Sequence, residues 1–215
     1  MIRLLSYIYP ITKKVKSDFN GTLEITWYNG KKHLNTKNAN YSYGSLQKIL
    51  KLGLQKIDLS HSKKILLLGM GGGSVIKTLQ QDFSYKNHIT AIDIDPIIID
   101  ISKEEFELVK SENLKIICVD ALQFMQQNNT QFDLIIIDLF VDTEIPSSFF
   151  SDSFWQDIID SVSSKGSILF NASLYESDNK KLSNIITQLN NNKYQVEKIE
   201  KVNQTNTLLV AKLPD

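Results

Sequence analysis

Short apolar runs and helical spacings alternate along this chain. Residues 65–68 and 89–92 are continuous apolar runs, typical of parallel strands buried on both faces. Between them, Val75, Ile76 and Leu79 fall at the spacing of one helix face. Further apolar runs of the strand kind are 114–119, 132–137 and 167–171. Strands that alternate with helices in this way predict an α/β fold.

Helices are predicted between these strands. Apolar positions begin after Ser45, which is a plausible N-cap for a helix. Asp95 is a second predicted N-cap, because Pro96 suits the first helical position. The other predicted helices run from residue 96 to about 109, from about 152 to 162, and from about 178 to 189. Lys165-Gly166 is predicted to be a turn before the strand at 167–171.

Each end of the chain carries a β-hairpin pattern. Residues 17–36 alternate around Asn29-Gly30, a strong two-residue turn signal. Residues 194–202 and 207–212 leave no room for a crossover helix, so they must pair antiparallel. The predicted fold is α/β: a Rossmann-like, doubly wound, mostly parallel sheet with an antiparallel last strand, plus a small N-terminal β-hairpin element. We divide it into a β element (1–44) and the main domain (45–215).

A glycine-rich turn follows the first strand of the main domain. Gly69, Gly71, Gly72 and Gly73 lie between that strand and the next helix, where glycine permits positive φ and close approach of a ligand. The N–H groups of the helix start favour a polar or anionic group. Asp93 ends the second strand 24 residues after Gly69, close to the roughly 20 expected for an acid that binds ribose. A nucleotide-type ligand is predicted.

Aspartates follow three successive strands. They are Asp93, Asp120 and Asp138. Ligands of open α/β sheets bind beyond the carboxyl ends of the strands, so these three side chains should converge on one edge. A single aspartate in such a place is usually a cap or turn residue, but the repetition indicates a site.

Composition excludes several other classes of function. Lys plus Arg and Asp plus Glu number 24 each among 215 residues, so no net field recruits nucleic acid or an anionic membrane. The three histidines are scattered, and the one cysteine, Cys118, is expected in the core, so neither a metal site nor a disulfide framework is predicted. Apolar residues near the start are too few for a membrane span. We expect a cytoplasmic protein.

The motifs of this core resemble a known family. They read LLLGMGGGSVIKTL (66–79), AIDIDPIII (91–99), CVDALQF (118–124) and FDLIIIDLF (132–140), followed by Pro146 and SDSFWQDI (151–158). The chain is similar in them to the S-adenosylmethionine-binding core of spermidine synthases and spermidine-synthase-like methyltransferases. The hairpin and NYSYGSLQKIL (40–50) lie where that family has its N-terminal β element and gate-like tyrosine segment.

The resemblance implies a cofactor site for S-adenosylmethionine or its decarboxylated form. By position, the glycine turn cradles the amino acid moiety of the cofactor. Asp93 would bind the ribose hydroxyls, and Asp120 with Ala121 would meet the adenine edge. Asp138 lies where polyamine synthases keep the aspartate that helps deprotonate the attacking amine. The family's habit of forming dimers implies a homodimer.

Residues for a small-molecule acceptor are expected near this edge. Tyr41, Tyr43 and Gln47 come shortly before the first strand of the sheet, where they either line a pocket or pack the β element on the core. Asp142 lies in the loop after Asp138 and is a further candidate for acceptor binding. Tyr41, Tyr43, Gln47 and Asp142 are therefore the predicted substrate-binding residues.

The chain departs from polyamine synthases at three places. Those enzymes carry a tyrosine-histidine-glutamate segment, an aspartate in the glycine loop and an aspartate-serine-serine-aspartate-proline run. The corresponding places here read Tyr43-Gly44-Ser45, Gly72 and DLFVD at 138–142. A diamine is a dication whose binding depends on fixed carboxylates, so fewer acids favour methyl transfer. Aminopropyl transfer, an NAD-dependent enzyme and a non-catalytic nucleoside-binding module are the alternatives.

Overall fold

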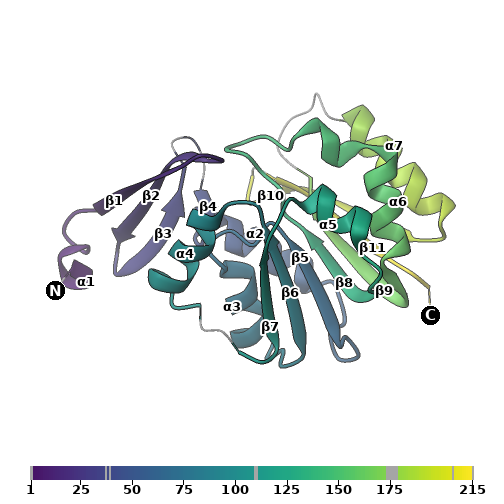
Figure 1. Ribbon diagram of the computed structural model, residues 1–215, viewed down its shortest axis with the longest axis horizontal. Helices are drawn as coiled ribbons and strands as arrows, with labels where there is room; N and C mark the ends of the chain where they lie inside the picture. The colour runs from purple at the N-terminus through teal and green to yellow at the C-terminus, as the bar shows by residue number, and fades with distance from the viewer. Residues whose placement is uncertain are drawn as a thin grey trace.

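Two β-sheets organise the protein, described here from a computed structural model that covers residues 2–36, 38, 40–108, 111–172, 179–204 and 206–214. A seven-stranded sheet forms the centre, and a four-stranded sheet lies at the N-terminal end of the molecule (Figure 1). The strands of the seven-stranded sheet are β5 (Lys64–Leu68), β6 (His88–Asp93), β7 (Leu114–Cys118), β8 (Phe132–Ile137), β9 (Val162–Asn171), β10 (Gln195–Val202) and β11 (Asn206–Lys212).

The order of the large sheet is β10-β11-β9-β8-β5-β6-β7. Neighbours pair in parallel, except that β11 pairs antiparallel with both β9 and β10. This arrangement confirms a mostly parallel, Rossmann-like sheet whose last strand is inserted antiparallel. Because β11 runs the other way, its first residue lies at the edge where the parallel strands end.

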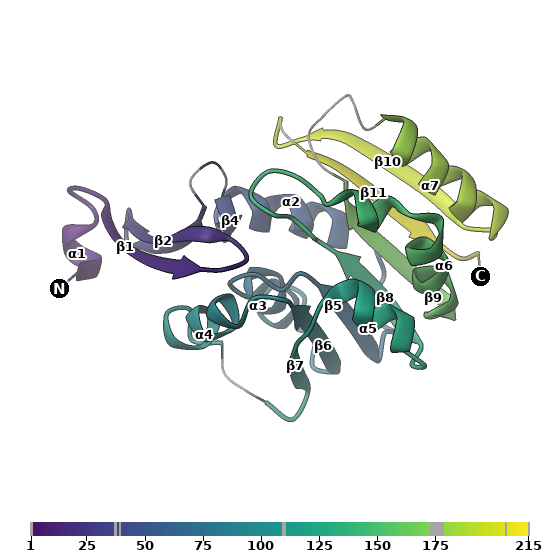
Figure 2. The same cartoon turned by 45° about the horizontal axis from the view of Figure 1, so that its top comes forward.

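Helices cover both faces of this sheet (Figures 1 and 2). One face carries α2 (Ser45–Leu54), α3 (Ser74–Gln81) and α4 (Pro96–Glu104); the other carries α5 (Ala121–Gln127), α6 (Asp152–Asp160) and α7 (Asn179–Asn191). Successive strand residues point to opposite faces. In β5, Ile65 and Leu67 pack with α2 and α3, whereas Leu66 and Leu68 pack with α5 and α6. The predicted doubly wound arrangement is confirmed.

The N-terminal sheet has four antiparallel strands, two more than the predicted hairpin. They are β1 (Ile11–Ser17), β2 (Gly21–Tyr28), β3 (Lys31–Asn35) and β4 (Asn40–Ser42), preceded by the short α1 (Ile2–Leu5). Asn29 and Gly30 both have positive φ, at 48° and 72°, as a type I′ turn requires. The hairpin is thus confirmed. The division of the chain at residue 44 stays a prediction.

Several predicted boundaries are wrong. Gly44, with φ 71°, is the N-cap of α2 in place of Ser45, because a positive φ turns the chain into the helix there. Helix α4 ends at Glu104, and α6 ends at Asp160. No turn separates α6 from the strand at Lys165-Gly166; β9 starts at Val162, and its register with β8 shifts over this stretch.

Cys118 is exposed, which corrects the prediction of a core cysteine. It ends β7, the edge strand of the sheet, where one side of the strand lacks a neighbour. The thiol lies 3.6 Å from the backbone oxygen of Ile94.

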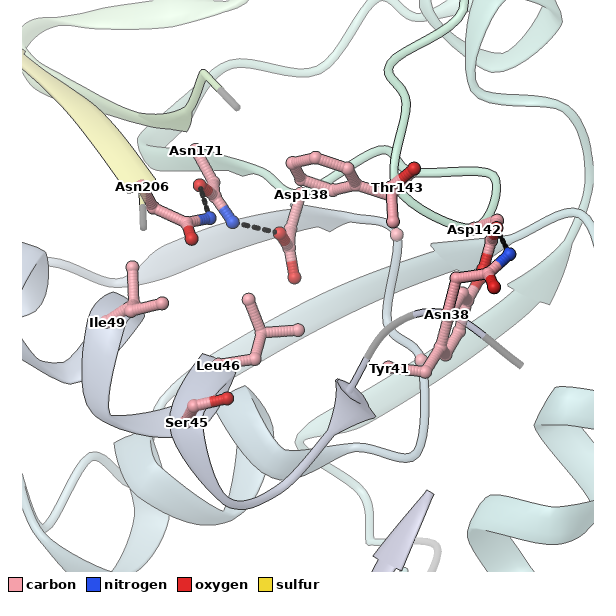
Figure 3. Close-up of a pocket in the computed structure, with 13 residues that line it drawn as sticks. Asn38, Tyr41, Ser45, Leu46, Ile49, Asp138, Asp142, Thr143, Asn171 and Asn206 are labelled. Atoms are coloured by element: carbon pink, nitrogen blue, oxygen red, sulfur yellow. Dashed lines mark hydrogen bonds between the residues drawn. The ribbon is translucent and has the colours of Figure 1, made fainter. Parts of the chain in front are cut away.

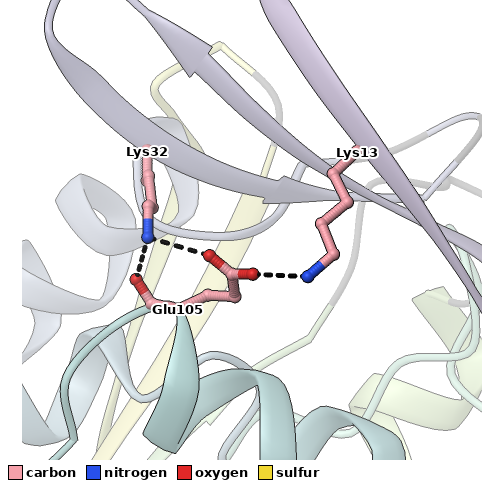
Figure 4. A network of polar contacts seen from close by, with 3 residues as sticks. All are labelled: Lys13, Lys32 and Glu105. Carbon is pink, nitrogen blue, oxygen red and sulfur yellow. Dashed lines mark hydrogen bonds and ion pairs between the residues drawn. The ribbon is translucent and has the colours of Figure 1, made fainter. Parts of the chain in front are cut away.

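Helix α4 joins the two sheets. Ile98, Ile101 and Phe106 pack with Leu23, Ile25 and Leu34 of the N-terminal sheet in one apolar cluster. Beside this cluster, Glu105 accepts hydrogen bonds from Lys13 at 2.7 Å and Lys32 at 2.9 Å (Figure 4). Lys32 also donates to the backbone oxygen of Glu105 at 2.6 Å. These lysines hold the pKa of Glu105 below its usual range, chiefly through the hydrogen bond from Lys13. The N-terminal sheet is thereby fixed beside the carboxyl ends of the parallel strands, which we call the ligand edge.

Candidate functional site

The carboxyl ends of β5, β6, β7 and β8 border two neighbouring cavities. The first, which we name the cofactor lobe, has a volume of about 200 Å³ and is lined by Asp93, Asp120, Ala121 and Asp138, among others. The second, named the acceptor lobe, has about 230 Å³ and is lined by Asp138, Asp142 and residues of α2. Together the lobes fall within the roughly 300–1,000 Å³ of ligand pockets.

Four residues line both lobes. They are Tyr41, Gly69, Asp138 and Phe140. The two lobes therefore meet at a common wall made by β4, the glycine turn and the loop after β8. Asp138 is the ionisable carboxylate in this wall, and Tyr41 contributes a phenol.

The glycine turn approaches the loop after β8 closely. A Cβ atom on Gly69 would lie 2.1 Å from the backbone oxygen of Asp138, so no other residue fits there. Gly69 and Gly71, with φ of 83° and 50°, line the acceptor lobe. Gly73, with φ 83°, is the N-cap of α3. A Cβ on Gly72 would instead meet the side chains of Ser42 and Tyr43 at 3.1 Å and 3.3 Å.

Asp93 is fixed by backbone groups of the glycine turn and of its own strand end. Its carboxylate accepts from Gly71 N and Asp95 N, both at 3.0 Å, and the residue is only 5% exposed. Burial raises the pKa of Asp93 to about 7, and backbone hydrogen bonds from Asp95, Gly71 and Met70 oppose that rise. The carboxyl group of Asp93 lines the cofactor lobe.

Asp95 has the structural role predicted for it. One oxygen accepts from Ile97 N at 2.9 Å, as the N-cap of α4. The other oxygen accepts from the Ser17 hydroxyl and from Asn20 Nδ2, the latter at 2.8 Å. Asn20 lines the cofactor lobe, so this fully buried carboxylate also positions part of the N-terminal sheet at the site.

Asp120 caps α5 while it lines the cofactor lobe. Its Oδ1 accepts from Leu122 N at 2.7 Å and Gln123 N at 3.1 Å. Ala121, the first residue of the helix, is buried next to it. One carboxylate oxygen is thus bound to the start of the helix, and Ala121 contributes a small side chain to the lining of the lobe.

Asp138 is part of a chain of polar side chains that sequence reasoning missed. Asn171 Nδ2 donates to Asp138 Oδ1 at 2.9 Å, and Asn206 Nδ2 donates to Asn171 Oδ1 at 2.8 Å (Figure 3). The second oxygen of Asp138 points away from Asn171 into the acceptor lobe (Figure 3). Burial raises the pKa of Asp138 to about 7, against the hydrogen bond from Asn171. A signal existed for Asn171, since it ends an apolar strand as the aspartates do.

The predicted acceptor residues fall into two groups. Tyr41 and Asp142 line the acceptor lobe. Burial, with Asp93 and Asp138 nearby, raises the pKa of Tyr41 well above its ordinary value. Asp142, at φ 56°, accepts at 2.5 Å from Thr36 and also from Asn38, so it ties the loop after β8 to the N-terminal sheet.

Tyr43 and Gln47 are placed differently, outside the lining of both lobes. The Tyr43 hydroxyl donates to Gly72 O at 3.1 Å, and its ring stacks on Phe106 at 4.4 Å. Gln47 donates to the Thr78 hydroxyl at 3.0 Å, which links α2 to α3. Tyr43 and Gln47 therefore pack the β element and α2 on the core, which is one of the two roles expected for them, and do not line the pocket.

Within the described ranges, no group of three or more His, Cys, Asp or Glu side chains is placed to hold a metal ion. Each helix in the described part of the chain is too short or too polar to span a bilayer.

Known proteins resemble this chain in sequence. Over 88 residues it is 28% identical to the polyamine aminopropyltransferase of Sulfurisphaera tokodaii, covering 39% of this chain and 29% of that protein. Over 120 residues it is 28% identical to the eEF1A lysine and N-terminal methyltransferase homolog of Drosophila melanogaster, covering 51% of this chain and 17% of that protein. The matches thus span less than a third of either relative.

Solved structures share the fold. Human methyltransferase-like protein 13, in complex with SAH, superimposes with a TM-score of 0.63 at 22% identity, covering 80% of this chain and 83% of that one. A probable spermidine synthase from Corynebacterium glutamicum gives 0.68 at 15% identity, covering 95% and 77%. The sequence also matches the spermine/spermidine synthase domain over residues 47–206, well over half of its length. The chain therefore belongs to the spermine/spermidine synthase domain family.

Proposed function

We propose that this protein is an S-adenosylmethionine-dependent transferase that moves a methyl group to a small acceptor. The observation that carries the proposal is the shared wall of the two lobes, where Asp138 faces both. A donor in the cofactor lobe and an acceptor in the other would meet at this wall. Holding two reactants in this way is the main means by which such an enzyme accelerates transfer.

The cofactor lobe fits the donor. Gly69 brings backbone without a side chain to the wall of this lobe, as close approach of a ligand requires, and Gly71 lines the adjoining acceptor lobe. Asp93 would accept from ribose hydroxyls, and Asp120 with Ala121 would border the adenine. When bound, S-adenosylmethionine supplies an electrophilic methyl group on its sulfonium.

Asp138 is the proposed proton acceptor. Its free oxygen points into the acceptor lobe, and its pKa of about 7 is near the value that suits a general base at neutral pH. In this role it would orient the nucleophilic group of the acceptor and take its proton. Tyr41 would exclude water from the same wall.

The acceptor lobe indicates what the acceptor is like. Leu46, Ile49 and Phe140 give it apolar surface, and Asp138 and Asp142 give it carboxylates. None of the described residues that line it is Lys, Arg or His. A neutral or cationic acceptor with an apolar part suits this lining better than an anion does.

Aminopropyl transfer is the second candidate, favoured by the two carboxylates of the acceptor lobe and by relatives named polyamine aminopropyltransferase. Against it stands Gly72, where the resemblance to polyamine synthases implies an aspartate that would repel the carboxylate of intact S-adenosylmethionine. We therefore expect intact S-adenosylmethionine to bind better than the decarboxylated form.

Thermal shift tests the cofactor. All ligands are compared at one concentration, and a ligand for which this is a hundred times its dissociation constant should stabilise by about 2.7 kcal/mol. We expect this from S-adenosylmethionine and S-adenosylhomocysteine, less from the decarboxylated form and methylthioadenosine, and none from NAD. Stabilisation by NAD alone would contradict the proposal.

By-product analysis then identifies the reaction. Incubation with panels of small amines, phenols and thiols should release S-adenosylhomocysteine if a methyl group is transferred, and methylthioadenosine from the decarboxylated donor if an aminopropyl group is. Asp138→Asn should abolish release while cofactor binding persists. If the variant instead loses cofactor binding and keeps its rate at saturation, Asp138 belongs to the cofactor site.

A further inference from the structure

We infer that Asn171 and Asn206 are positioning residues for Asp138, which hold its carboxylate in one orientation and favour its ionised form. The inference rests on the proposed function for the role of Asp138 as proton acceptor. Neither asparagine was expected from the sequence to belong to the site, and each acts through the next member of the chain.

Sheet topology brings the three side chains together. In the parallel pair β8 and β9, Ile137 lies opposite Phe170, so Asp138 and Asn171 are the next residues along both strands. Strand β11 runs antiparallel beside β9, with Leu208 opposite Asn171, and this direction places its first residue, Asn206, at the same edge. The two hydrogen bonds therefore link the carboxyl ends of the parallel strands β8 and β9 to the start of the antiparallel strand β11.

The two amides, which also line the acceptor lobe, bond to each other and to Asp138. Asn171 is fully buried and Asn206 is 9% exposed. Because an ionised carboxylate only accepts hydrogen bonds, Asn171 must turn its NH₂ group towards Asp138. Its oxygen is then left to accept from Asn206, which is the arrangement found. A protonated Asp138 that donated to Asn171 would need both amides turned round.

Among the described residues around Asp138, the side chain that stabilises its ionised form is Asn171. Among the described residues that line the two lobes, the other titratable groups are Tyr41 from β4, Asp142 from the loop of Asp138, and Asp93 and Asp120 in the cofactor lobe. No Lys, Arg or His is among the described residues lining either lobe, so no cation stabilises the carboxylate there. The hydrogen bond from Asn171 is what lowers the pKa of Asp138 against burial.

Carbon-13 NMR titration of the aspartate carboxyl groups tests the inference. The resonance missing from Asp138→Asn identifies Asp138, whose midpoint should lie at about 7 in the wild type. In Asn171→Leu, which keeps the number and branching of the side-chain heavy atoms and removes the donor, the midpoint should rise by about one unit. In Asn206→Leu it should rise by about half a unit, because Asn171 is then less firmly oriented.

The control is Asn113→Leu. Asn113 precedes β7 at the opposite edge of the sheet and donates to Lys86 O at 2.8 Å. It should leave the midpoint of Asp138 unchanged. An unchanged midpoint in a folded Asn171→Leu overturns the inference, and so does an unchanged midpoint in Asn206→Leu if Asn171→Leu fails to fold.

This titration needs neither donor nor acceptor. A shifted midpoint in a protein that transfers no group would therefore overturn the proposed function and leave the coupling of Asn171 to Asp138 in place. An unshifted midpoint in an active enzyme would overturn the inference alone.

Discussion

At the scale of single residues, Asp93 holds two backbone segments together at the carboxyl ends of the strands. Its carboxylate fixes the glycine turn through Gly71 N and the start of α4 through Asp95 N. A ligand hydroxyl bound by this carboxylate would therefore contact a group that two backbone segments already hold. Such preorganisation lowers the entropic cost of binding.

We expect Asp93→Ala to weaken S-adenosylhomocysteine binding at least tenfold. Two hydrogen bonds from ribose hydroxyls to a charged acceptor would be lost, each contributing about 1.5–3 kcal/mol. Isothermal titration calorimetry measures the effect. Asp100→Ala removes an exposed acid from α4 that pairs with Lys103, and it should leave the affinity unchanged. Equal affinity in a folded Asp93→Ala would contradict the role.

Gly72 allows a test of cofactor choice. We expect Gly72→Asp to favour the decarboxylated donor over S-adenosylmethionine, because two charges about 4 Å apart interact by roughly 4 kcal/mol at an effective dielectric of 20. A Cβ here presses on Ser42 and Tyr43, so Gly72→Ala is the control for crowding alone. The ratio of the dissociation constants of the two donors should change in Gly72→Asp and stay the same in Gly72→Ala. A wild type that prefers the decarboxylated donor would point to aminopropyl transfer.

Some residues of the site could be found from the sequence and others could not. Asp93, Asp120 and Asp138 were visible because each follows a continuous apolar run. Asn171 also follows an apolar run. A neutral amide does not by itself indicate a catalytic or binding role, so Asn171 is recognised only once its hydrogen bond to Asp138 is seen. Asn206 begins a strand, and only the antiparallel insertion of β11 brings it to the ligand edge.

At the scale of elements, local pattern decided what could be predicted. The parallel strands and the Asn29-Gly30 hairpin have strong local signals. Strand β1 carries consecutive lysines at 13 and 14, and β4 has three residues, so both depend on pairing with distant segments. The sequence predicts a turn at Lys165-Gly166, because glycine is typical of turns. In the structure β9 runs through these residues, with a shift in its register against β8.

Glu105 offers a test of how the N-terminal sheet is held. We expect Glu105→Gln to lower the free energy of unfolding by about 1 kcal/mol or less, since the pairs with Lys13 and Lys32 are partly exposed to solvent. Urea denaturation at neutral pH and low salt measures the change, and added salt should reduce it. Glu112→Gln, which changes an exposed acid outside this cluster, is the control. An equal effect of both substitutions would contradict the prediction.

At the scale of the whole molecule, the two raised carboxyl pKa values predict how stability depends on pH. Asp93 and Asp138 have folded pKa values of about 7, against an ordinary 3.8. Between these values the folded protein binds more protons, so stability should fall as pH rises from about 4 to 7. A shift of three units corresponds to at most about 4 kcal/mol for each group, and less where water enters the lobes.

Thermal melts from pH 5 to 8 measure this dependence. His33 opposes it, because burial lowers the pKa of this histidine and its contribution rises with pH. The comparison is therefore with Asp93→Asn and Asp138→Asn, whose melting temperatures should decline less over the same range. Parallel curves for wild type and both variants would contradict the raised pKa values.

The antiparallel insertion of β11 also governs when the site can be completed. Asp138 and Asn171 meet once β8 and β9 have paired, but Asn206 lies 35 residues beyond Asn171 and arrives only when β11 enters between β9 and β10. During synthesis the aspartates of the ligand edge emerge first, and the strand that completes the polar chain emerges after them. A partly folded chain that lacks β11 would have Asn171 without its bond to Asn206, so we expect the orientation of Asp138 seen in the complete fold to be reached late in folding.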